Sequence, residues 1–485
     1  MPQIGEHART SPRFVKGQTV NRRFLLDNDG CNVFRSLTED WERDIRETVE
    51  ECPPNVTTYL ICAGAGTLYF PTQVGVADPK AYPLLKAHAA GGDPFGELIR
   101  ALRAAGKETF ITLRMNDVHN PDAEDQWNTP KVRREHPDCV VDYEAIRRGN
   151  PDWMAYCLDY SRAEVQQYGH GIIGELADRY QFDGLQLDWM RFPRHLSGTP
   201  AEVWEKREVL TEFTAGVQTT VSKLGARLAA RIPTSVAGCR RLGLDIAEWT
   251  RRGLVDFLVA SPFLTTDFSP PVQDMRRAMG GNPVPLYAAF DFNHATQEHC
   301  PESLRAACTS LYECGADGIY VFNFPCWTEY LAARPYHWLT GLDDPETARR
   351  KPLLFSVSHR THRIADVDLP AELPVTAAAG ETRLVTLPIP KAALPVKRAL
   401  LLVHAGGDVA ASVNGIACGE LPHRRSELFL EYVDRASWER NHAAGLEPRL
   451  FRIDPATVKP GENRIEIENR AAQDNAITRV NVGLW

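Results

Sequence analysis

The stretch at residues 183–195, DGLQLDWMRFPRH, places a carboxylate directly after a short run of strand-forming residues. Asp188 ends that run, and Trp189 and Arg191 follow it at once. A carboxylate at the end of a strand either caps a turn or is held at the rim of a site as a functional group. Arg191 is close enough along the chain to keep Asp188 ionised by charge pairing. We therefore predict that Asp188 takes part in catalysis or in substrate binding.

Carboxylates, amides and cations also follow several other apolar runs of the sequence. Cleavage of a glycosidic bond needs two carboxyl groups, one to donate a proton and one to act as nucleophile or base. The predicted catalytic residues are Asp188 and a partner, either Asp117 or Asp291. Planar polar groups and aromatic rings suit a sugar, and the predicted substrate-binding residues are Asn28, Asp29, Arg114, Asn116, His119, Trp189, Arg191, Asn293 and Asn323.

Plainer interpretations stand beside these predictions. Asp117 also fits a residue that caps the chain within a loop, Asp291 is equally well explained as a loop residue, and Asn28 and Asp29 also fit a simple strand end. A metal site built from Asp117, His119 and Asp291 is a further alternative, but no HxH or HExxH spacing supports it. We predict neither a metal nor a cofactor.

Eight short apolar runs between residues 20 and 342 are expected to position these side chains. They are RFLLD (23–27), TTYLICA (57–63), TFITLR (109–114), GLQLD (184–188), RLAARI (227–232), VDFLVAS (255–261), PLYAAFD (285–291) and GIYVFNF (318–324). Amphipathic stretches such as 161–180 and 302–314 separate most of them. Apolar strands that alternate with helices predict a parallel sheet covered on its outside. Eight repeats predict an α/β fold, a closed (β/α)8 TIM barrel with its site at the carboxyl ends of the strands.

Two local features refine this prediction. The stretch between the third strand and the helix at 161 is too long for a bare connector and contains Trp127 and Trp153, so we expect a lid over the site. Ser161 and Glu164 have the spacing of a capping box at the start of that helix.

The segment YQFDGLQLDWMRFP (180–193) resembles the fourth strand of glycoside-hydrolase-like barrels, whose hallmark is the pattern DGI-x-x-D-x-x-R-(F/Y)-P. The upstream segment LDYSRAEVQQY (158–168) is similar to the one that precedes this strand in those proteins. The resemblance is good over the third and fourth strands and loose over the rest of the barrel. It implies a sugar-cleaving barrel with Asp188 at the family's acidic position, and it leaves the substrate open.

The pattern of the chain changes after about residue 345. Short, often alternating runs such as TRLVTLPI, RALLLVHAGG and NRIEIEN are separated by the turn signals VNG and PGEN. They predict an antiparallel β-sandwich of jelly-roll type. We expect a flexible N-terminal segment at 1–19, the catalytic barrel at 20–342, a linker at 343–352 and the sandwich at 353–485. The sandwich is expected to be structural and not to carry the chemistry, the alternative being a sugar-binding module.

Composition bounds the function further. The net charge of −8 argues against binding of nucleic acid through bulk charge, and no apolar stretch is long enough to cross a membrane. The first residues lack the apolar core of a signal peptide, so a cytoplasmic protein is expected, although a chain whose leader had been removed would look the same. The eleven cysteines contain no CxxC and are expected to be buried free thiols.

The leading hypothesis is a glycosidase acting on an oligosaccharide or small glycoside, with a carbohydrate as its partner and a homo-oligomer left open. Its rivals are a sugar-binding barrel without activity and a metal-assisted hydrolase or lyase acting on a sugar.

Overall fold

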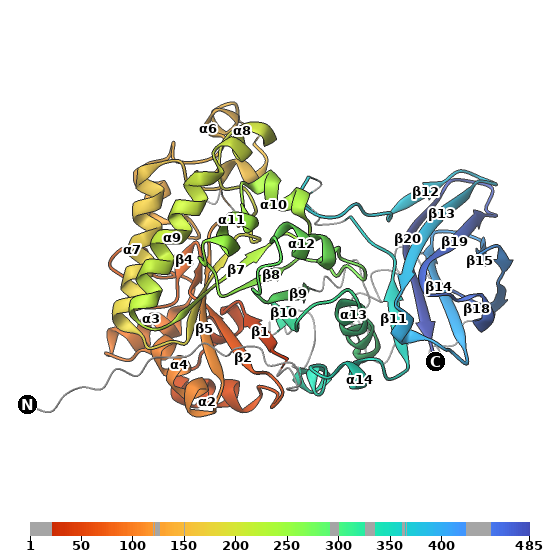
Figure 1. The fold of residues 1–485 in the computed structure, drawn as a ribbon, viewed down its shortest axis with the longest axis horizontal. Coiled ribbons are helices and arrows are strands. Elements are labelled where there is room, and N and C mark those ends of the chain that lie inside the picture. The colour runs from red at the N-terminus through yellow and green to blue at the C-terminus, as the bar shows by residue number, and fades with distance from the viewer. Residues whose placement is uncertain are drawn as a thin grey trace, which may run out of the picture.

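The structure is a computed structural model, and it describes residues 22–119, 121, 127–149, 151–291, 300–324, 335–360, 364, 366–422 and 448–485. A barrel, coloured red to green in Figure 1, lies beside a smaller sandwich in blue. The predicted fold class is confirmed. Among the described residues, no helix has the length and apolar character that crossing a membrane requires.

Eight parallel strands close the barrel, and each corresponds to one of the predicted runs. In chain order they are β1 (Phe24–Asn28), β2 (Thr58–Cys62), β5 (Glu108–Arg114), β6 (Gly184–Asp188), β7 (Arg227–Ile232), β8 (Phe257–Ala260), β9 (Leu286–Phe290) and β10 (Ile319–Phe322). Neighbours along the chain pair with one another, and β1 pairs with β10 to close the circle. The strands form here because apolar residues occupy both faces, as a sheet covered on its outside requires.

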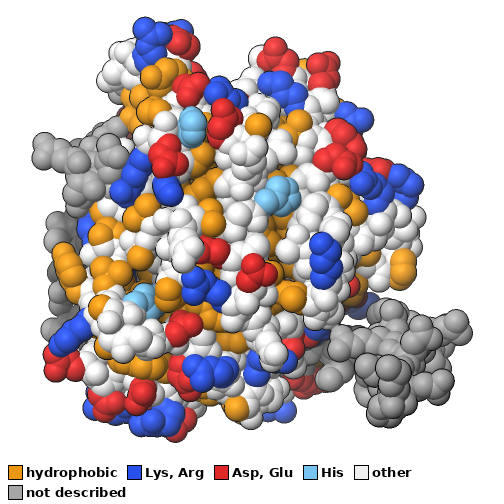
Figure 2. Space-filling view, turned by 90° about the vertical axis from the view of Figure 1, so that its left-hand side faces the viewer, with side chains coloured by type: hydrophobic (Ala, Val, Ile, Leu, Met, Phe, Trp, Pro, Cys, Tyr) orange, Lys and Arg blue, Asp and Glu red, His pale blue; other side chains and the backbone are white. Residues whose placement is uncertain are grey.

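Helices surround the strands on the outside of the barrel (Figure 1). They are α1 (Cys31–Phe34), α2 (Trp41–Glu50), α3 (Tyr82–Ala89), α4 (Pro94–Ala104), α5 (Lys131–Glu135), α6 (Tyr143–Arg147), η1 (Trp153–Tyr156), α7 (Ala163–Arg179), α8 (Pro200–Glu205), α9 (Arg207–Lys223), α10 (Val236–Leu242), α11 (Ile246–Arg251), α12 (Val272–Ala278) and α13 (Pro301–Glu313). The short hairpin β3 (Gly64–Ala65) and β4 (Thr67–Leu68) follows β2. Acidic and basic side chains are interspersed over the face in Figure 2.

The helices predicted at 161–180 and 302–314 are confirmed as α7 and α13. The predicted capping box at the start of α7 is wrong, because Arg162 is the N-cap and makes no side-chain cap. The Ser161 hydroxyl donates instead to Asp159, two residues earlier in the chain, at 2.7 Å. The spacing of Ser161 and Glu164 fits a capping box, but the Ser161 hydroxyl bonds to the carboxylate of Asp159 in the preceding loop.

The interior of the barrel changes from apolar to polar along its axis. An apolar cluster fills one part and consists of Leu25, Leu60, Phe110, Ala229, Phe257, Val259, Tyr287, Ala289, Tyr320 and Phe322. Residues two apart on a strand face the same side. Asp27 therefore follows Leu25 into the interior, Thr112 and Arg114 follow Phe110, Arg231 follows Ala229, and Asp291 follows Ala289. The carboxyl ends of the strands thus turn a series of polar side chains inward.

The C-terminal domain consists of two antiparallel sheets. One contains β11 (Leu353–Ser356), β12 (Val375–Ala377), β14 (Ala399–Ala405), β17 (Gly419–Leu421), β18 (Pro448–Ile453) and β20 (Asn475–Leu484), and the other contains β13 (Thr382–Ile389), β15 (Val409–Val413), β16 (Ile416–Ala417) and β19 (Gly461–Asn469). Short 3-10 turns, η3 (Tyr336–Leu339), η4 (Lys391–Ala393) and η6 (Pro455–Thr457), lie before and within this domain.

The barrel and the sandwich meet along α13 and the stretch predicted as a linker. That stretch contains a short helix, α14 (Pro345–Ala348), which lies with α13 between the two domains in Figure 1. The guanidinium of Arg305, on α13, donates to the carbonyl of Pro352 at 2.8 Å. The rings of Phe268 and Phe355 pack edge to face across the junction, with centroids 5.7 Å apart.

A second contact between the domains reaches the mouth of the barrel. We name residues 364 and 366–368 the docking segment. The carboxylate of Asp366 contacts both Arg194 and Arg241, and that of Asp368 accepts the backbone N–H of Phe263 at 3.1 Å. Val367 is 1% exposed. The C-terminal chain is therefore fastened to the loops that follow β6 and β8.

Candidate active site

Asp188 lies at the end of β6 and points into the barrel. Its side chain is fully buried, and Oδ1 accepts the backbone N–H groups of Met190 at 2.9 Å and Arg191 at 3.2 Å. Nη1 of Arg231 lies 3.1 Å from Oδ2 and 3.2 Å from Oδ1. The prediction that the Arg191 side chain pairs with Asp188 is wrong. The partner is Arg231, which stands opposite Asp188 in the register of β6 and β7.

Arg231 is itself held firmly inside the barrel. Its Nε donates to the hydroxyl of Ser261 at 2.9 Å, and its guanidinium carbon lies 3.5 Å from the centroid of the Phe322 ring. A buried ion pair of this kind is tolerated only when further hydrogen bonds satisfy both partners.

A second buried carboxyl group, Asp27 on β1, lies in the same interior. Its Oδ2 accepts hydrogen bonds from the hydroxyls of Thr112 and Tyr320, both at 2.8 Å. Burial raises the pKa of Asp27 to about 6, and the charge of Asp188 adds to this rise, whereas the hydrogen bond from Tyr320 opposes it. Gln186, two residues before Asp188, donates to the Tyr320 hydroxyl at 2.8 Å. Asp27 and Asp188 therefore lie in the same interior, and the charge of Asp188 affects the pKa of Asp27.

Asp27 was not among the predicted site residues, although the sequence contains a signal for it. A carboxylate two residues after Leu25 on an apolar strand must face the same interior as that leucine. Arg231 shows the same signal within the run RLAARI. A search for charged residues two positions from an inward-facing apolar residue of a buried strand would have identified both.

At the rim, both carboxylate oxygens of Asp117 have hydrogen-bond partners. Arg114 donates to its Oδ2 at 2.9 Å, and the side chain of Asn128 donates to Oδ1 at 2.9 Å. His119 Nδ1 lies 2.5 Å from the same Oδ1. Burial by itself would raise the pKa of Asp117, but the neighbouring His119, Arg114 and Arg191 hold it well below the usual carboxyl range. Asp117 is therefore an ionised anchor for its neighbours.

His119 connects this anchor to Arg191. Its Nε2 lies 2.9 Å from Nη2 of Arg191, so the imidazole accepts there while its Nδ1–H donates to Asp117. The Arg191 side chain is buried, and its pKa is lowered by burial and by the nearby Arg114. Among the described residues, Nε and Nη1 of Arg191 have no hydrogen-bond partner. Such donors suit the hydroxyl or carboxylate oxygens of a ligand.

The remaining rim residues come from other strands. Asp29, after β1, lies 3.5 Å from Nη2 of Arg114. Asp291, after β9, is 1% exposed, and its charge acts on Arg191. Asn323, after β10, has a left-handed backbone with φ of 60° and donates its backbone N–H to the carbonyl of Asp27 at 3.2 Å. The predicted Asn293 lies outside the described residues.

Three predicted substrate-binding residues have structural partners instead. Asn28 donates to the Tyr59 hydroxyl at 2.7 Å and accepts the N–H of Gly30. Asn116 accepts the N–H of Leu158 at 2.7 Å and donates to the carbonyl of Arg194 at 2.6 Å. The ring of Trp189 is fully buried and packs against Tyr160, His195, Phe213 and Trp249. The structure does not support a substrate contact for these three side chains.

Two of the residues weighed as metal ligands, Asp117 and His119, are engaged with other groups. Asp117 and His119 are hydrogen-bonded to each other. Arg114 also donates to Oδ2 of Asp117, and Arg191 to Nε2 of His119. Over the part of the chain that the structure describes, no three His, Cys, Asp or Glu side chains gather into a metal-binding group. The ten described cysteines are free thiols, and seven of them are buried as predicted, whereas Cys31, Cys314 and Cys418 are partly exposed.

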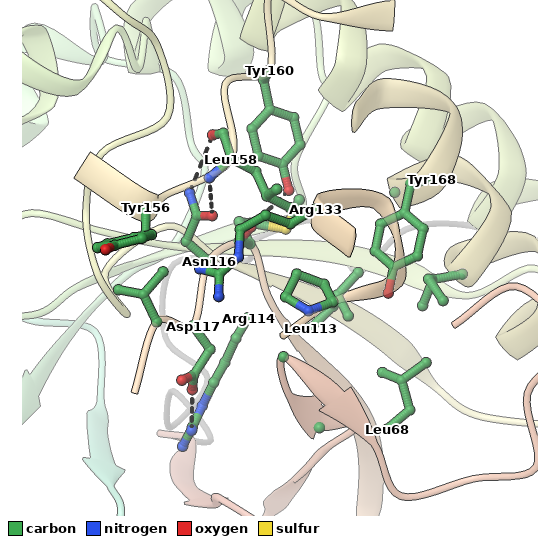
Figure 3. Close-up of a pocket in the computed structure, with 17 residues that line it drawn as sticks. Leu68, Leu113, Arg114, Asn116, Asp117, Arg133, Tyr156, Leu158, Tyr160 and Tyr168 are labelled. Atoms are coloured by element: carbon green, nitrogen blue, oxygen red, sulfur yellow. Dashed lines mark hydrogen bonds and ion pairs between the residues drawn. The ribbon is translucent and has the colours of Figure 1, made fainter. Parts of the chain in front are cut away.

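A small cavity of about 50 Å³ lies behind the rim, between β5 and α7. Figure 3 shows Leu68, Leu113 and Tyr168 around it, with the Asp117–Arg114 pair at its edge. The hydroxyl of Tyr160 donates to the carbonyl of Met115 at 2.8 Å. Leu113 alternates with the inward-facing Thr112 and Arg114 and so faces outward. This cavity is therefore distinct from the mouth, and its volume suits one or two water molecules.

No protein-family model and no curated protein sequence matches this chain. The barrel is similar to the glycoside hydrolase domain of PgaB (BpsB) from Bordetella bronchiseptica, with a TM-score of 0.45, 14% identity and coverage of 66% of this chain and 98% of that one. It is also similar to α-L-fucosidase isoenzyme 2 from Paenibacillus thiaminolyticus (TM-score 0.42, 14% identity, 62% of this chain and 46% of that one).

A third similar structure is a class V chitinase from Pseudomonas fluorescens Pf-5, with a TM-score of 0.38, 11% identity and coverage of 65% of this chain and 98% of that one. All three TM-scores lie below 0.5. The function is therefore inferred from the geometry of the site.

Proposed function

We propose that this protein is a glycoside hydrolase that cleaves a glycosidic bond of an oligosaccharide or small glycoside. The observation that carries the proposal is the presence of two buried carboxylates, Asp188 and Asp291, at the carboxyl ends of β6 and β9. Barrels of this architecture hold their active sites at that end. Glycoside cleavage needs two carboxyl groups that differ in protonation.

Asp188 takes the role of the ionised carboxylate, as nucleophile or as stabiliser of a cationic transition state. Its ion pair with Arg231 and its two backbone donors keep the charge in place without solvent. A fixed charge of this kind needs no reorganisation when the positive charge of the sugar develops.

Asp291 takes the role of proton donor. Of the other rim carboxylates, Asp29 and Asp117 both contact Arg114, and the pKa of Asp117 lies well below the usual range, which is wrong for an acid. Asp291, which is 1% exposed, is the remaining rim carboxylate, and it is assigned this role by elimination. Arg191 and His119, on the same rim, are proposed to bind substrate hydroxyls.

One observation favours the rival function of a sugar-binding barrel without activity. The Asp188 side chain has no exposed surface, so it also fits a residue that only supports the mouth. The two functions differ in what happens when its charge is removed while its shape is kept.

The test compares Asp188→Asn and Asp291→Asn with Asp183→Asn, a control at the opposite end of the same strand β6. Asp183 accepts the N–H of Thr109 at 2.9 Å, so the control alters a structural carboxylate. A panel of aryl glycosides and oligosaccharides gives kcat for each folded variant. Asp188→Asn should lower kcat by several orders of magnitude on every substrate. Asp291→Asn should lose less on aryl glycosides with acidic leaving groups, which need no proton donor.

Two results would contradict the proposal. If Asp188→Asn folds and keeps more than about a tenth of the wild-type kcat, a loss of at most ~1.4 kcal/mol, Asp188 is not catalytic. If the wild type binds sugars, as seen by thermal stabilisation, but turns over none of the panel, the sugar-binding function is correct.

A further inference from the structure

Trp153 is an exposed aromatic side chain beside the rim network. It begins the 3-10 helix η1, whose N-cap Asp152 accepts the N–H of Met154 at 3.2 Å. Trp153 is 47% exposed. Single exposed apolar residues are common and need no explanation by themselves. Trp153 differs from such residues in its contacts with the rings beside the site.

A line of rings connects Trp153 to the site. The centroid of its ring lies 6.4 Å from that of Phe192, and the Phe192 ring meets His119 edge to face at 4.8 Å. The same phenyl ring lies 5.3 Å from the guanidinium carbon of Arg191. Trp153 is therefore the outermost member of a series that begins at the Asp117–His119–Arg191 network.

The backbone supports this arrangement at an energetic cost. Phe192 has a left-handed backbone with φ of 50°, which is unfavourable for a residue with a side chain. Strained residues of this kind are concentrated at ligand-binding and catalytic positions. The Phe192 ring contacts Arg191, His119 and Trp153.

The chain on either side of Trp153 borders open space. Asp152 and Met154 line a groove of about 660 Å³ together with Asp142, Arg194 and Glu202. A groove of this volume accommodates a ligand larger than one sugar ring. Its lining includes the guanidiniums of Arg194 and Arg241 beside carboxylates and short apolar stretches. Trp153 lies between the lining residues Asp152 and Met154 in the chain, and its ring is near that of Phe192.

We propose that Trp153 is the stacking platform of an outer subsite, which binds the second or third ring of an oligosaccharide whose scissile bond lies at Asp188. The indole face carries partial negative charge and attracts the polarised C–H groups on the flat side of a pyranose ring. This inference rests on the proposed glycosidase function and adds a substrate class to it. The preferred substrate is a chain of at least three sugar units.

The test measures kcat/KM against chain length. Wild type, Trp153→Ala and Trp153→Phe are assayed with a 4-nitrophenyl monoglycoside and with oligosaccharides of two to six units of the sugar it cleaves. Trp153→Ala should lose at least tenfold on three or more units, through KM, and less than twofold on the monoglycoside. Trp153→Phe should restore most of the loss. Tyr82→Ala, on α3, removes a side chain that is 73% exposed and serves as the control.

An equal effect of Trp153→Ala on short and long substrates, or no effect, would overturn the subsite. A wild type that cleaves nothing in the panel defeats the proposed function without deciding about the subsite. Calorimetric titration with the same oligosaccharides then decides. Weaker binding of long chains to Trp153→Ala than to wild type supports the subsite, and absence of binding to wild type overturns it.

Discussion

The barrel and the sandwich both bury polar side chains, but they use them differently. In the barrel interior, buried polar side chains bond to one another, as Asp27 does with Thr112 and Tyr320 and Asp188 with Arg231. In the sandwich, buried asparagines bond to backbone carbonyls. Asn469 donates to the carbonyls of Ala377, Ala378 and Gln473.

This difference has a physical meaning. An asparagine that satisfies backbone carbonyls fixes a turn and carries no charge that depends on pH. A network of carboxyl, guanidinium and hydroxyl groups in a dry interior costs stability unless every member is paired, and its charges respond to one another. Asn469 therefore serves the fold of the sandwich, whereas Asp27, Asp188 and Arg231 give the barrel a charged interior that suits chemistry.

Arg231→Met should have the largest effect, because it leaves the buried Asp188 without its cation. We expect a loss of about 3–5 kcal/mol in the free energy of unfolding and a fall in kcat of at least a hundredfold. Urea denaturation and aryl glycoside kinetics measure the two. The double variant Asp188→Asn/Arg231→Met should regain much of the stability and none of the activity. If Arg231→Met is as stable as wild type, the ion pair does not organise the barrel interior.

Asp27 should make the stability of the barrel depend on pH. Its pKa is raised from 3.8 to about 6 in the folded protein, so the folded state binds the extra proton and the stability it provides is lost as pH rises from about 4 to about 6. The difference corresponds to about 3 kcal/mol. Asp27→Asn should remove this decline and be more stable than wild type above pH 7. Urea unfolding at pH 4.5 and 7.5 tests it, and parallel curves for the two proteins would contradict it.

The docking segment should couple the sandwich to the site with a smaller effect. Asp368→Ala leaves the N–H groups of Phe263 and Ile364 without their acceptor, at a cost of about 1–3 kcal/mol. Phe263 packs 6.1 Å from Phe192, centroid to centroid, so kcat/KM should fall several-fold. Asp408→Ala, which removes a surface ion pair with Arg449 inside the sandwich, is the control. Equal kinetics for the two variants would show that the sandwich does not position the mouth.

Asn469→Ala should have the smallest effect on turnover. It removes three hydrogen bonds to backbone carbonyls, of which that of Ala377 is buried, and should lower the midpoint of thermal unfolding, with a loss of about 1–3 kcal/mol. The kcat/KM of the folded protein should stay within twofold of wild type. A larger kinetic change would mean that the turns of the sandwich also position the site.

The sequence predicted the strands well because a strand that is buried on both faces is a nearly continuous run of apolar residues. It also located Asp188, Asp117 and Asp291 at the carboxyl ends of their strands, since side-chain alternation and chain direction fix that end. It did not predict their partners. Arg191 is near Asp188 along the chain, but the turn after β6 carries its side chain to His119 at the rim.

The sequence by itself determined which residues face the interior of this barrel, because the two-residue period of a strand is a local property. Only the tertiary structure decided which of them meet. Asp188 pairs with Arg231 because the register of β6 and β7 sets them side by side, and the Tyr320 hydroxyl reaches Asp27 because β10 closes the barrel against β1. Registers and closure join residues that are remote along the chain, and no local pattern encodes them.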